Sequence, residues 1–548
     1  MKNKGSELAQ PRSAFAPFRH PAFRTLWTAT LVSNLGGLVQ GVGAAWAMTL
    51  LTPSPTLIAL VQTTTTLPVM LFAMASGALA DSFDRRRIML LAQVLMLLVS
   101  VALAVTAWMG GLTPRLLLAF TFLIGAGGAL HNPSWQASMG DLVSRDDLPA
   151  AVSLNSVGFN LMRSIGPAAG GLIVATLGAA AAFAFNAASY VPLIAALFRW
   201  RPETRPRLAP REGFVPAMGA GLRYVALSPN LLRVLARGLF FGLTGASVLA
   251  LLPLVVRDMI GGGSFLYGLL LGAFGLGAIG GALLNPWLRA TLANERIVQI
   301  AFLAMALAAA ALSQSHTLWL SVLAMLPAGA AWVLALSLFN VTVQLSTPRW
   351  VVGRALALYQ MATFGGLAAG AWIWGVVASA QGVDVALIGS AAGLGLGAVL
   401  GLWVPVPQFG TLDLDPAGRF REPVLRLDMR GRSGPIMVMI DYRIDQADVP
   451  AFLAAMGERR RIRRRDGARN WALLRDLEEP ELWSESYHVA TWDEYLRHNL
   501  RRTKADIAVS ERILALHRGP DQPRVHRMIE RHNVSPEDDL PLRSADPP

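Results

Sequence analysis

Acidic and basic side chains crowd one short loop near the start of the chain, in the string Gly77-Ala-Leu-Ala-Asp81-Ser-Phe-Asp84-Arg85-Arg86-Arg87. A carboxylate here can accept hydrogen bonds at a helix N-terminus and can pair with a guanidinium. Because such contacts can form in one conformation and break in another, these residues could act as a conformational latch. The plainer interpretation is that the arginines only fix the side of a membrane on which the loop lies.

Long apolar segments flank this loop. A membrane-spanning helix needs about 20 apolar residues, and segments of that kind lie at 25–51, 56–80, 88–109, 115–140, 149–176, 179–198, 233–256, 264–288, 296–314, 317–345, 352–380 and 384–404. Only 15% of the 548 residues are charged, against about 25% in soluble proteins. The sequence therefore predicts an all-α membrane protein of twelve transmembrane helices in two six-helix halves.

Positive charge is concentrated in the membrane part. Before Val404 the chain has 24 Lys and Arg against 11 Asp and Glu, and after it 24 against 24. The net charge of +13 therefore gives no support to nucleic-acid binding by the tail. With the N-terminus inside, only Arg115 and Arg257 of the loop cations fall outside, so we expect both termini in the cytoplasm.

The chain has no cysteine and its eight histidines lack metal-ligand spacing, so we expect neither metal nor cofactor.

Composition divides the chain into six parts. They are a cytoplasmic N-terminal segment (1–24), a first half (25–198), an Arg- and Pro-rich cytoplasmic linker (199–232) with a short surface helix near 213–227, a second half (233–404), an α+β domain (405–518) and a disordered tail (519–548). The N-terminal segment has no apolar core of a cleavable signal peptide. In the α+β domain we expect strands at 436–444, 470–475 and 482–489 and helices at 448–465 and 492–516, which is most of a ferredoxin-like unit.

A second copy of the loop pattern follows in the second half, as Gly281-Ala-Leu-Leu-Asn285 with Arg289 and Arg296 after it. Two similar loops indicate an internal duplication. The first copy, Gly-x-Leu-x-Asp-x-x-x-Arg-Arg, resembles the loop between the second and third helices of major facilitator superfamily transporters. The resemblance implies a latch for one of two access states, made by Gly77, Asp81, Asp84, Arg85, Arg86 and Asn285. Since Asp84 replaces a usual glycine and Asn285 replaces the acid, we expect a strong latch in the first half and a weak one in the second.

Small residues and a proline mark the fifth apolar segment, at Gly158, Gly166, Pro167, Gly170 and Gly171. Small residues let helices approach closely, and the proline allows a kink. The string resembles the Gly-Pro-x-x-Gly-Gly signature of the fifth helix in drug:proton antiporters.

Further strings, beginning at Asn132-Pro133, Arg145-Asp146 and Arg354-Ala355, resemble the enterobactin-exporter-like branch of the superfamily. The tail is similar to the dimeric α+β barrel domains of antibiotic-biosynthesis monooxygenases. The resemblance implies a secondary transporter of the bacterial inner membrane, which exports a siderophore or drug-like molecule by alternating access against protons. It also implies a homodimer through the C-terminal domain.

Arg163 is a formal charge inside a span, which costs about 2.5–3.5 kcal/mol on insertion scales and marks a functional candidate. It could attract anionic substrate groups from a cavity, or reach the cytoplasmic side. His131 is the best candidate for a protonatable group within a helix, with packing as the alternative. Other polar groups on the spans either bond between helices or line the cavity. We expect the cavity or coupling candidates to include Asn34, Gln40, Asn132, Asn340, Gln344 and Tyr359.

Two other functions compete with transport. One is a membrane-tethered enzyme in which the tail carries the chemistry, since Trp471, Trp483, His488, Trp492 and His498 invite an oxygenase interpretation. No general base or metal constellation accompanies these aromatic residues, which are usually core. The other is a scaffold that does not transport. The basic run at 459–465 is expected to be a solvated helix face, or to contact anionic lipid.

Overall fold

The computed structural model describes residues 15–144, 146–201, 214–348, 350–408, 413–415, 417–418 and 420–530, with backbone only at 78, 80–82, 149 and 214–217. The chain divides into two compact units. We call the first the membrane unit; it comprises Met1–Arg211, Arg233–Thr342 and Leu356–Gln408. The second is the C-terminal unit, which comprises Glu212–Leu232, Val343–Ala355 and Phe409–Pro548.

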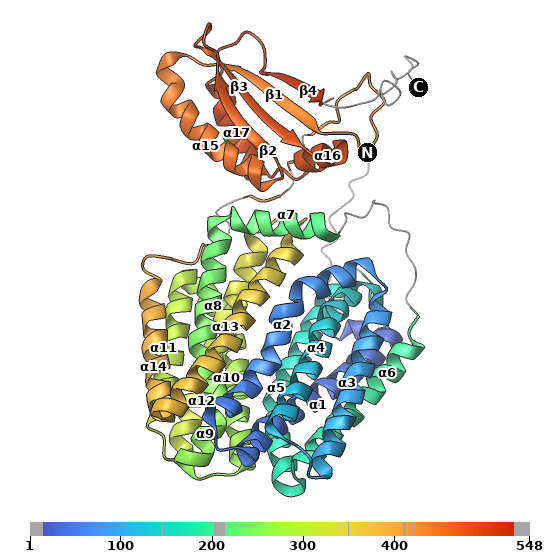
Figure 1. Ribbon diagram of the computed structural model, residues 1–548, viewed down its shortest axis with the longest axis vertical. Helices are drawn as coiled ribbons and strands as arrows, with labels where there is room; N and C mark the ends of the chain where they lie inside the picture. Colours follow the sequence, from blue (N-terminus) through green and yellow to red (C-terminus); the bar gives the residue numbers. More distant parts are fainter. Residues whose placement is uncertain are drawn as a thin grey trace, which may run out of the picture. The chain divides into compact units, whose positions relative to one another are not determined.

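Long helices account for most of the chain (Figure 1). After a short helix η1 (Ala16–Arg19), the first half has α1 (Pro21–Leu51), α2 (Pro55–Ser82), α3 (Arg85–Trp108), α4 (Pro114–Leu142), α5 (Leu148–Leu177) and α6 (Ala179–Arg199). The second half has α8 (Pro229–Ala250), continued by α9 (Leu252–Leu254) and η2 (Val255–Ile260), then α10 (Ser264–Thr291), α11 (Asn294–Ser313), α12 (Leu318–Leu345), α13 (Val352–Gln381) and α14 (Val383–Leu400). Each predicted span therefore coincides with a helix.

Ten helices of the described chain are long and apolar enough to cross a membrane, which confirms a mostly helical membrane fold. The two long helices outside that group are α1 and α5, with 31 and 30 residues. Both carry many small and polar residues, and α5 also carries Arg163.

Helices of the first half pack in pairs: α1 on α5 and α6, α2 on α4, and α3 on α4 and α6. The halves meet where α5 packs along α10. Here Gly171 faces Gly268, and a Cβ on Gly171 would lie 2.9 Å from the Gly268 Cα. Because glycine has no side chain, the backbones of the two helices can approach closely here.

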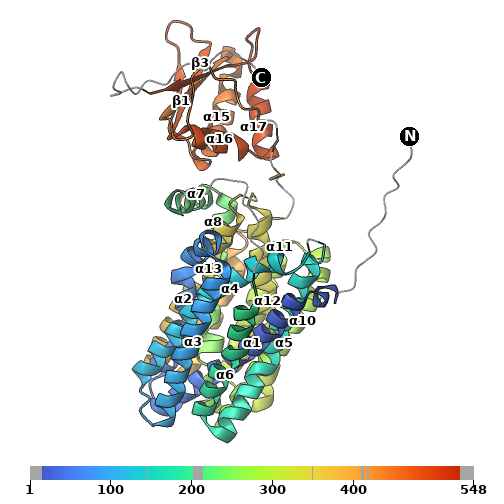
Figure 2. The same ribbon diagram turned by 90° about the vertical axis from the view of Figure 1, so that its right-hand side faces the viewer.

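In the C-terminal unit, α7 (Phe214–Ala226) confirms the short helix that the sequence predicts in the linker. The rest is an antiparallel sheet, ordered β2-β3-β1-β4, with helices on one face (Figure 2). Its elements are β1 (Ile436–Arg443), η3 (Gln446–Asp448), α15 (Val449–Arg465), β2 (Arg469–Arg475), β3 (Leu482–Val489), α16 (Trp492–Leu500), α17 (Lys504–Ala515) and β4 (Arg524–Ile529). Phe452 and Tyr487 lie in the core between the sheet and the helices.

Two predictions for this unit are wrong. The range 519–548, predicted to be disordered, contains β4, which pairs with β1 and completes a β-α-β-β-α-β order. Because β4 is a largely exposed edge strand, it lacks the apolar run by which buried strands are found. The helix predicted at 492–516 is two helices. Thr503 starts the second with a capping box, since its side chain and that of Asp506 bond each other's backbone N–H.

Candidate functional site

The loop between α2 and α3 is fastened to two other helices of the first half. Asp84 caps α3 by accepting the Arg86 N–H at 2.9 Å. Arg85 donates to the Ala137 carbonyl and the Asp141 carboxylate near the end of α4, both at 2.9 Å. Arg86 donates to the carbonyls of Leu197 (2.8 Å) and Phe198 (2.9 Å) at the end of α6. Each arginine thus stabilises a helix C-terminus, where carbonyls carry partial negative charge.

Of the other loop candidates, Gly77 has open space around its Cβ position. The side chain of Asp81 lies outside the described part of the chain. In the second copy, Asn285 and Arg289 donate to the Ser337 hydroxyl of α12 at 3.1 and 3.3 Å. Both copies therefore contact other helices of their own half. The conformational latch for one of two access states stays a prediction.

Arg163 lies near the middle of α5, about 22 Å along the helix from Leu148 at 1.5 Å per residue. Its guanidinium carbon is 5.5 Å from the centre of the Phe274 ring on α10. No carboxylate of the described residues pairs with it. The half-buried charge consequently lies where the two halves meet, and a cation–π contact offsets only part of its desolvation.

Hydrogen bonds join the halves near the α1–α2 turn. The Thr56 N–H donates to the Ser379 hydroxyl at 3.1 Å, and the two hydroxyls lie 2.6 Å apart. Thr63 donates to the Ala368 carbonyl at 2.9 Å, two turns deeper on α13 than Gly375, which accepts from Thr56. The described hydrogen bonds between α2 and α13 thus run from the α1–α2 turn to the middle of α13.

The remaining cavity candidates occupy diverse surroundings. Gln40 is buried and accepts hydrogen bonds from Asn186 and Ser100, in a network that ties α1 to α3 and α6. His131 is buried, and its Nδ1 has no partner among the described residues. The Tyr359 hydroxyl donates to the Leu336 carbonyl at 3.1 Å. Asn34 and Asn340 are half-buried, and Asn132 and Gln344 are exposed.

The predicted packing residues of α5 face two different helices. A Cβ on Gly158 would meet Leu31 and Trp27, one on Gly166 would meet Leu38, and one on Gly170 would meet Val39, all on α1. Gly171 and the Pro167 carbonyl face Gly268 on α10 instead. The small residues therefore pack α5 against its own half on one side and against the second half on the other.

Sequence reasoning missed a buried ion pair in the second half. Arg237 of α8 donates to Glu295 of α11 at 2.9 Å and to the Gly397 carbonyl of α14. Glu295 also accepts the Val406 N–H at 2.7 Å. Because the partners are 58 or more residues apart, neither spacing nor composition signals them.

The basic run 459–465 is only partly solvated, so that prediction is wrong for two arginines. Arg459 and Arg463 of α15 are buried and pair with Glu485 of β3, at 2.7 and 3.1 Å. Trp471 donates to the same fully buried carboxylate at 3.0 Å. Burial alone would raise the pKa of Glu485, but attraction to Arg463 and Arg459 outweighs it and lowers the pKa to about 2.

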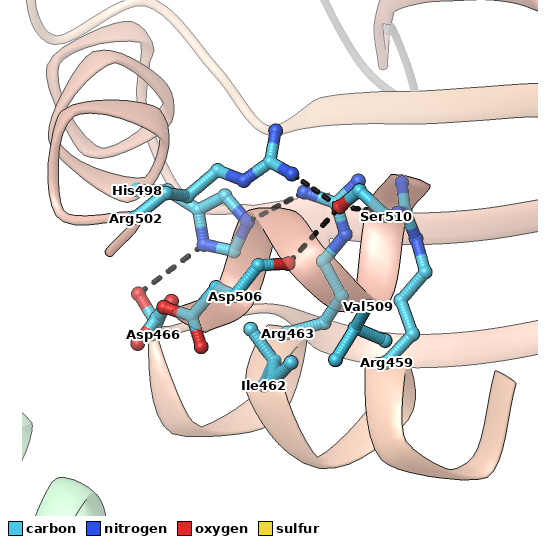
Figure 3. A pocket seen from close by; sticks show the side chains of 9 residues that line it. All are labelled: Arg459, Ile462, Arg463, Asp466, His498, Arg502, Asp506, Val509 and Ser510. Atoms are coloured by element: carbon cyan, nitrogen blue, oxygen red, sulfur yellow. Dashed lines mark hydrogen bonds between the residues drawn. The ribbon is translucent and has the colours of Figure 1, made fainter. Parts of the chain in front are cut away.

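The pocket in Figure 3 lies beside this ion pair and has room for about one water molecule, near 10 Å³. His498 enters it and bonds Arg463 at 3.1 Å and the Asp466 carbonyl at 3.3 Å. Burial and the neighbouring Arg463 hold the pKa of His498 well below its usual value, so the imidazole is neutral. Burial and the same Arg463 lower the pKa of Arg502 to about 10.

The aromatic residues that invited an oxygenase interpretation serve packing and hydrogen bonding. Trp483 and Trp492 lie in the core, Trp471 and His498 bond the buried ion pair, and His488 pairs with Glu530 at 2.6 Å. Within the described residues, no group of three His, Asp or Glu is arranged to hold a metal.

Solved structures show the fold of the membrane unit. A bacterial homologue of the human lysosomal transporter Spinster, crystallised inward-facing and unoccupied, matches with a TM-score of 0.54 and 14% identity, over 71% of this chain and 97% of that one. An auto-inhibited POT family peptide transporter matches with a TM-score of 0.57 and 13% identity, over 74% and 98%. At these identities the likeness shows the fold alone, which is that of major facilitator transporters.

The family follows from the sequence. The model of the transmembrane secretion effector family matches residues 12–535, and the chain belongs to that family. It is therefore a multi-pass membrane protein of a transporter family, which is non-enzymatic.

Relatives of known function are distant. The staphyloferrin A transporter of Staphylococcus aureus is 26% identical over 255 residues, which are 46% of this chain and 64% of that protein. The enterobactin exporter EntS of Shigella flexneri is 28% identical over 386 residues, 68% of this chain and 90% of that protein. EntS of Shigella boydii is 29% identical and is matched over only half its length. The chain is thus distantly related to siderophore transporters.

Proposed function

We propose that this protein exports a small organic molecule, siderophore-like or drug-like, across the bacterial inner membrane by alternating access coupled to proton entry. Its twelve spans form two six-helix halves that rock around a midplane site. Both termini lie in the cytoplasm. The family and the distant siderophore exporters support this direction and substrate class.

The observation that carries the proposal is the position of Arg163. A cation in the middle of a span is costly and is retained where it serves a pathway. Its contact with Phe274 places it at the junction of the halves, where a substrate site is expected in this fold. A guanidinium binds carboxylates and other oxyanions with two parallel hydrogen bonds. We therefore assign Arg163 to the anionic groups of the substrate.

The hydrogen bonds between α2 and α13 support alternating access. With a cytoplasmic N-terminus, the α1–α2 turn lies outside, so Thr56 and Ser379 join the halves at the outer end. Contacts at the outer end are expected in a state whose central cavity is closed to the outside. Export then requires these contacts to break while others form at the inner end.

The test is efflux of a compound panel from cells with and without a proton uncoupler. The panel should contain citrate-based and catechol siderophores and neutral drug-like compounds. We expect Arg163→Ala to lower efflux of anionic compounds by about tenfold or more, the loss of one charge-assisted contact, and Arg163→Lys to retain part of it. Arg296→Ala, which removes an exposed cation, is the matched control. Equal efflux by Arg163→Ala and the native protein would refute the assignment.

The C-terminal unit has no assigned activity. Its buried charges are paired with one another, as in a folded scaffold. The predicted homodimer through this unit stays a prediction, and the mass of the purified chain in detergent would test it.

A further inference from the structure

A stack of aromatic and cationic side chains joins α7 to the rest of the C-terminal unit. The guanidinium carbon of Arg465 lies 5.0 Å from the centre of the Tyr224 ring. Tyr224 meets Trp350 edge-on, with ring centres 5.6 Å apart. Arg501 covers Trp350 at 4.0 Å. Four elements, α15, α7, the α12–α13 turn and the end of α16, are thereby held together, since a cation–π pair contributes about 0.5–2 kcal/mol.

A pocket of about 430 Å³ opens beside this stack, a size typical of small-molecule sites. It is lined by Arg223, Ala226, Leu227, Arg464, Ala468, Arg469 and Asn470. The wall on one side is therefore α7, and on the other the end of α15 and the start of β2. Three of the seven side chains are arginines and none is acidic.

The three guanidinium groups come from different elements and have no carboxylate partner among the described residues. Arg464 and Arg469 are exposed. Arg223 is half-buried, and its Nε is shielded from solvent without a hydrogen-bond partner in the described part of the chain. Such a donor costs free energy until something accepts from it.

Acidic groups near the pocket are already engaged. Asp466 bonds Arg465 at 2.9 Å, and Asp506 bonds Arg465 at 2.8 Å. The Glu494 Oε1 approaches Gly467, as Arg223 does, and its Oε2 accepts the Ala490 N–H at 3.3 Å, but Glu494 does not line the pocket. The lining of the pocket is cationic because it holds three arginines and no acidic side chain.

We propose that this pocket binds an organic oxyanion, whose phosphate or carboxylate groups bridge Arg223 of α7 to Arg464 and Arg469 of the C-terminal domain. Ala226, Leu227 and Ala468 supply an apolar surface for the carbon skeleton of the ligand. Occupancy strengthens the association of the linker helix with the domain. The site is separate from the proposed transport site and does not depend on it.

Two sources could supply this chemistry, an anionic phospholipid headgroup or a soluble organic anion. The purified full chain is placed in phosphatidylcholine nanodiscs, where citrate and inorganic phosphate are titrated by calorimetry. In parallel, amide exchange of Met218–Leu227 is compared in phosphatidylcholine discs, in the same discs with citrate, and in discs containing phosphatidylglycerol. Protection by citrate identifies a soluble anion, and protection by phosphatidylglycerol alone identifies a lipid headgroup. Either supports the site.

Variants decide whether the effect belongs to the pocket. The double substitution Arg464→Ala/Arg469→Ala should weaken binding by about tenfold or more, and Ala226→Trp should block it sterically with no change of charge. Arg461→Ala removes an exposed arginine of the same helix that does not line the pocket, and should leave binding unchanged. Circular dichroism verifies that each variant is folded. No protection by either probe, or protection that survives both pocket variants, would overturn the proposal.

Discussion

A disulfide between α2 and α13 should arrest transport. The hydroxyl oxygens of Thr56 and Ser379 lie 2.6 Å apart, and a disulfide joins its sulfurs at about 2.05 Å. The substitutions Thr56→Cys and Ser379→Cys therefore place two thiols within bonding reach of each other. The chain contains no cysteine, so the two introduced thiols are the only ones. No native cysteine has to be replaced first.

The hydrogen bonds that join α2 to α13 are weak. Four of them run from the α1–α2 turn to the middle of α13. At about 0.6 kcal/mol for an average interhelical hydrogen bond in a membrane, they sum to about 2 kcal/mol. Thermal motion opens a contact of that strength on the timescale of transport, whereas a covalent bond holds the halves closed at this end. We expect efflux by the oxidised double-cysteine protein to fall to background and to recover with a reductant.

Efflux is measured before oxidation, after oxidation with copper phenanthroline and again after reduction. A protease site inserted in the linker 202–210 reports cross-linking, because only cross-linked halves stay together after cleavage. The matched control pairs Thr64→Cys with Thr121→Cys, whose hydroxyls lie 2.8 Å apart on α2 and α4 of the same half. That disulfide should form and leave efflux intact. Full efflux from completely cross-linked Thr56–Ser379 protein would refute alternating access at this interface.

Two other predictions concern buried and loop carboxylates. Since the pKa of Glu485 falls from 4.5 to about 2 on folding, its stabilisation of the C-terminal unit, about 3 kcal/mol, is complete above pH 4.5 and is lost as the pH falls through 2. Glu485→Gln should remove this pH dependence and cost about 3–5 kcal/mol at pH 7; chemical unfolding followed by tryptophan fluorescence measures both, and Glu481→Gln is the exposed control. Asp81→Ala should abolish efflux while membrane insertion stays normal, as measured by efflux and by fractionation, and undiminished efflux would contradict the latch.

Apolar segments predicted the membrane helices well. In hydrocarbon every backbone group must be bonded within the segment, so a long apolar run has one structural solution, and α3 and α12 coincide with 88–109 and 317–345 to within a few residues.

Pairs distant in sequence could not be predicted in the same way. Nothing in the sequence distinguishes Arg237 and Arg459 from surface arginines. Only the folded structure brings Glu295 to Arg237 and Glu485 to Arg459. The strand β4 was missed for a related reason, since its stability comes from pairing with β1 rather than from an apolar pattern of its own. Thr503 is different, because the string Thr-x-x-Asp was a local signal for a helix start.

Rigid-body rocking requires that the contacts which open between the halves be weaker than the contacts within each half. Arg85 and Arg86 tie α3 to α4 and α6, and the buried pair of Arg237 and Glu295 ties α8 to α11, where losing one partner costs about 3–5 kcal/mol. The α2–α13 contact is worth about half of that by the estimate from membrane hydrogen bonds. A fluctuation large enough to open the interface therefore leaves each half intact. We infer that the arginine loop serves transport first by keeping the helices of the first half together. Arg86→Ala should therefore loosen the packing of the first half before it changes the balance of access states.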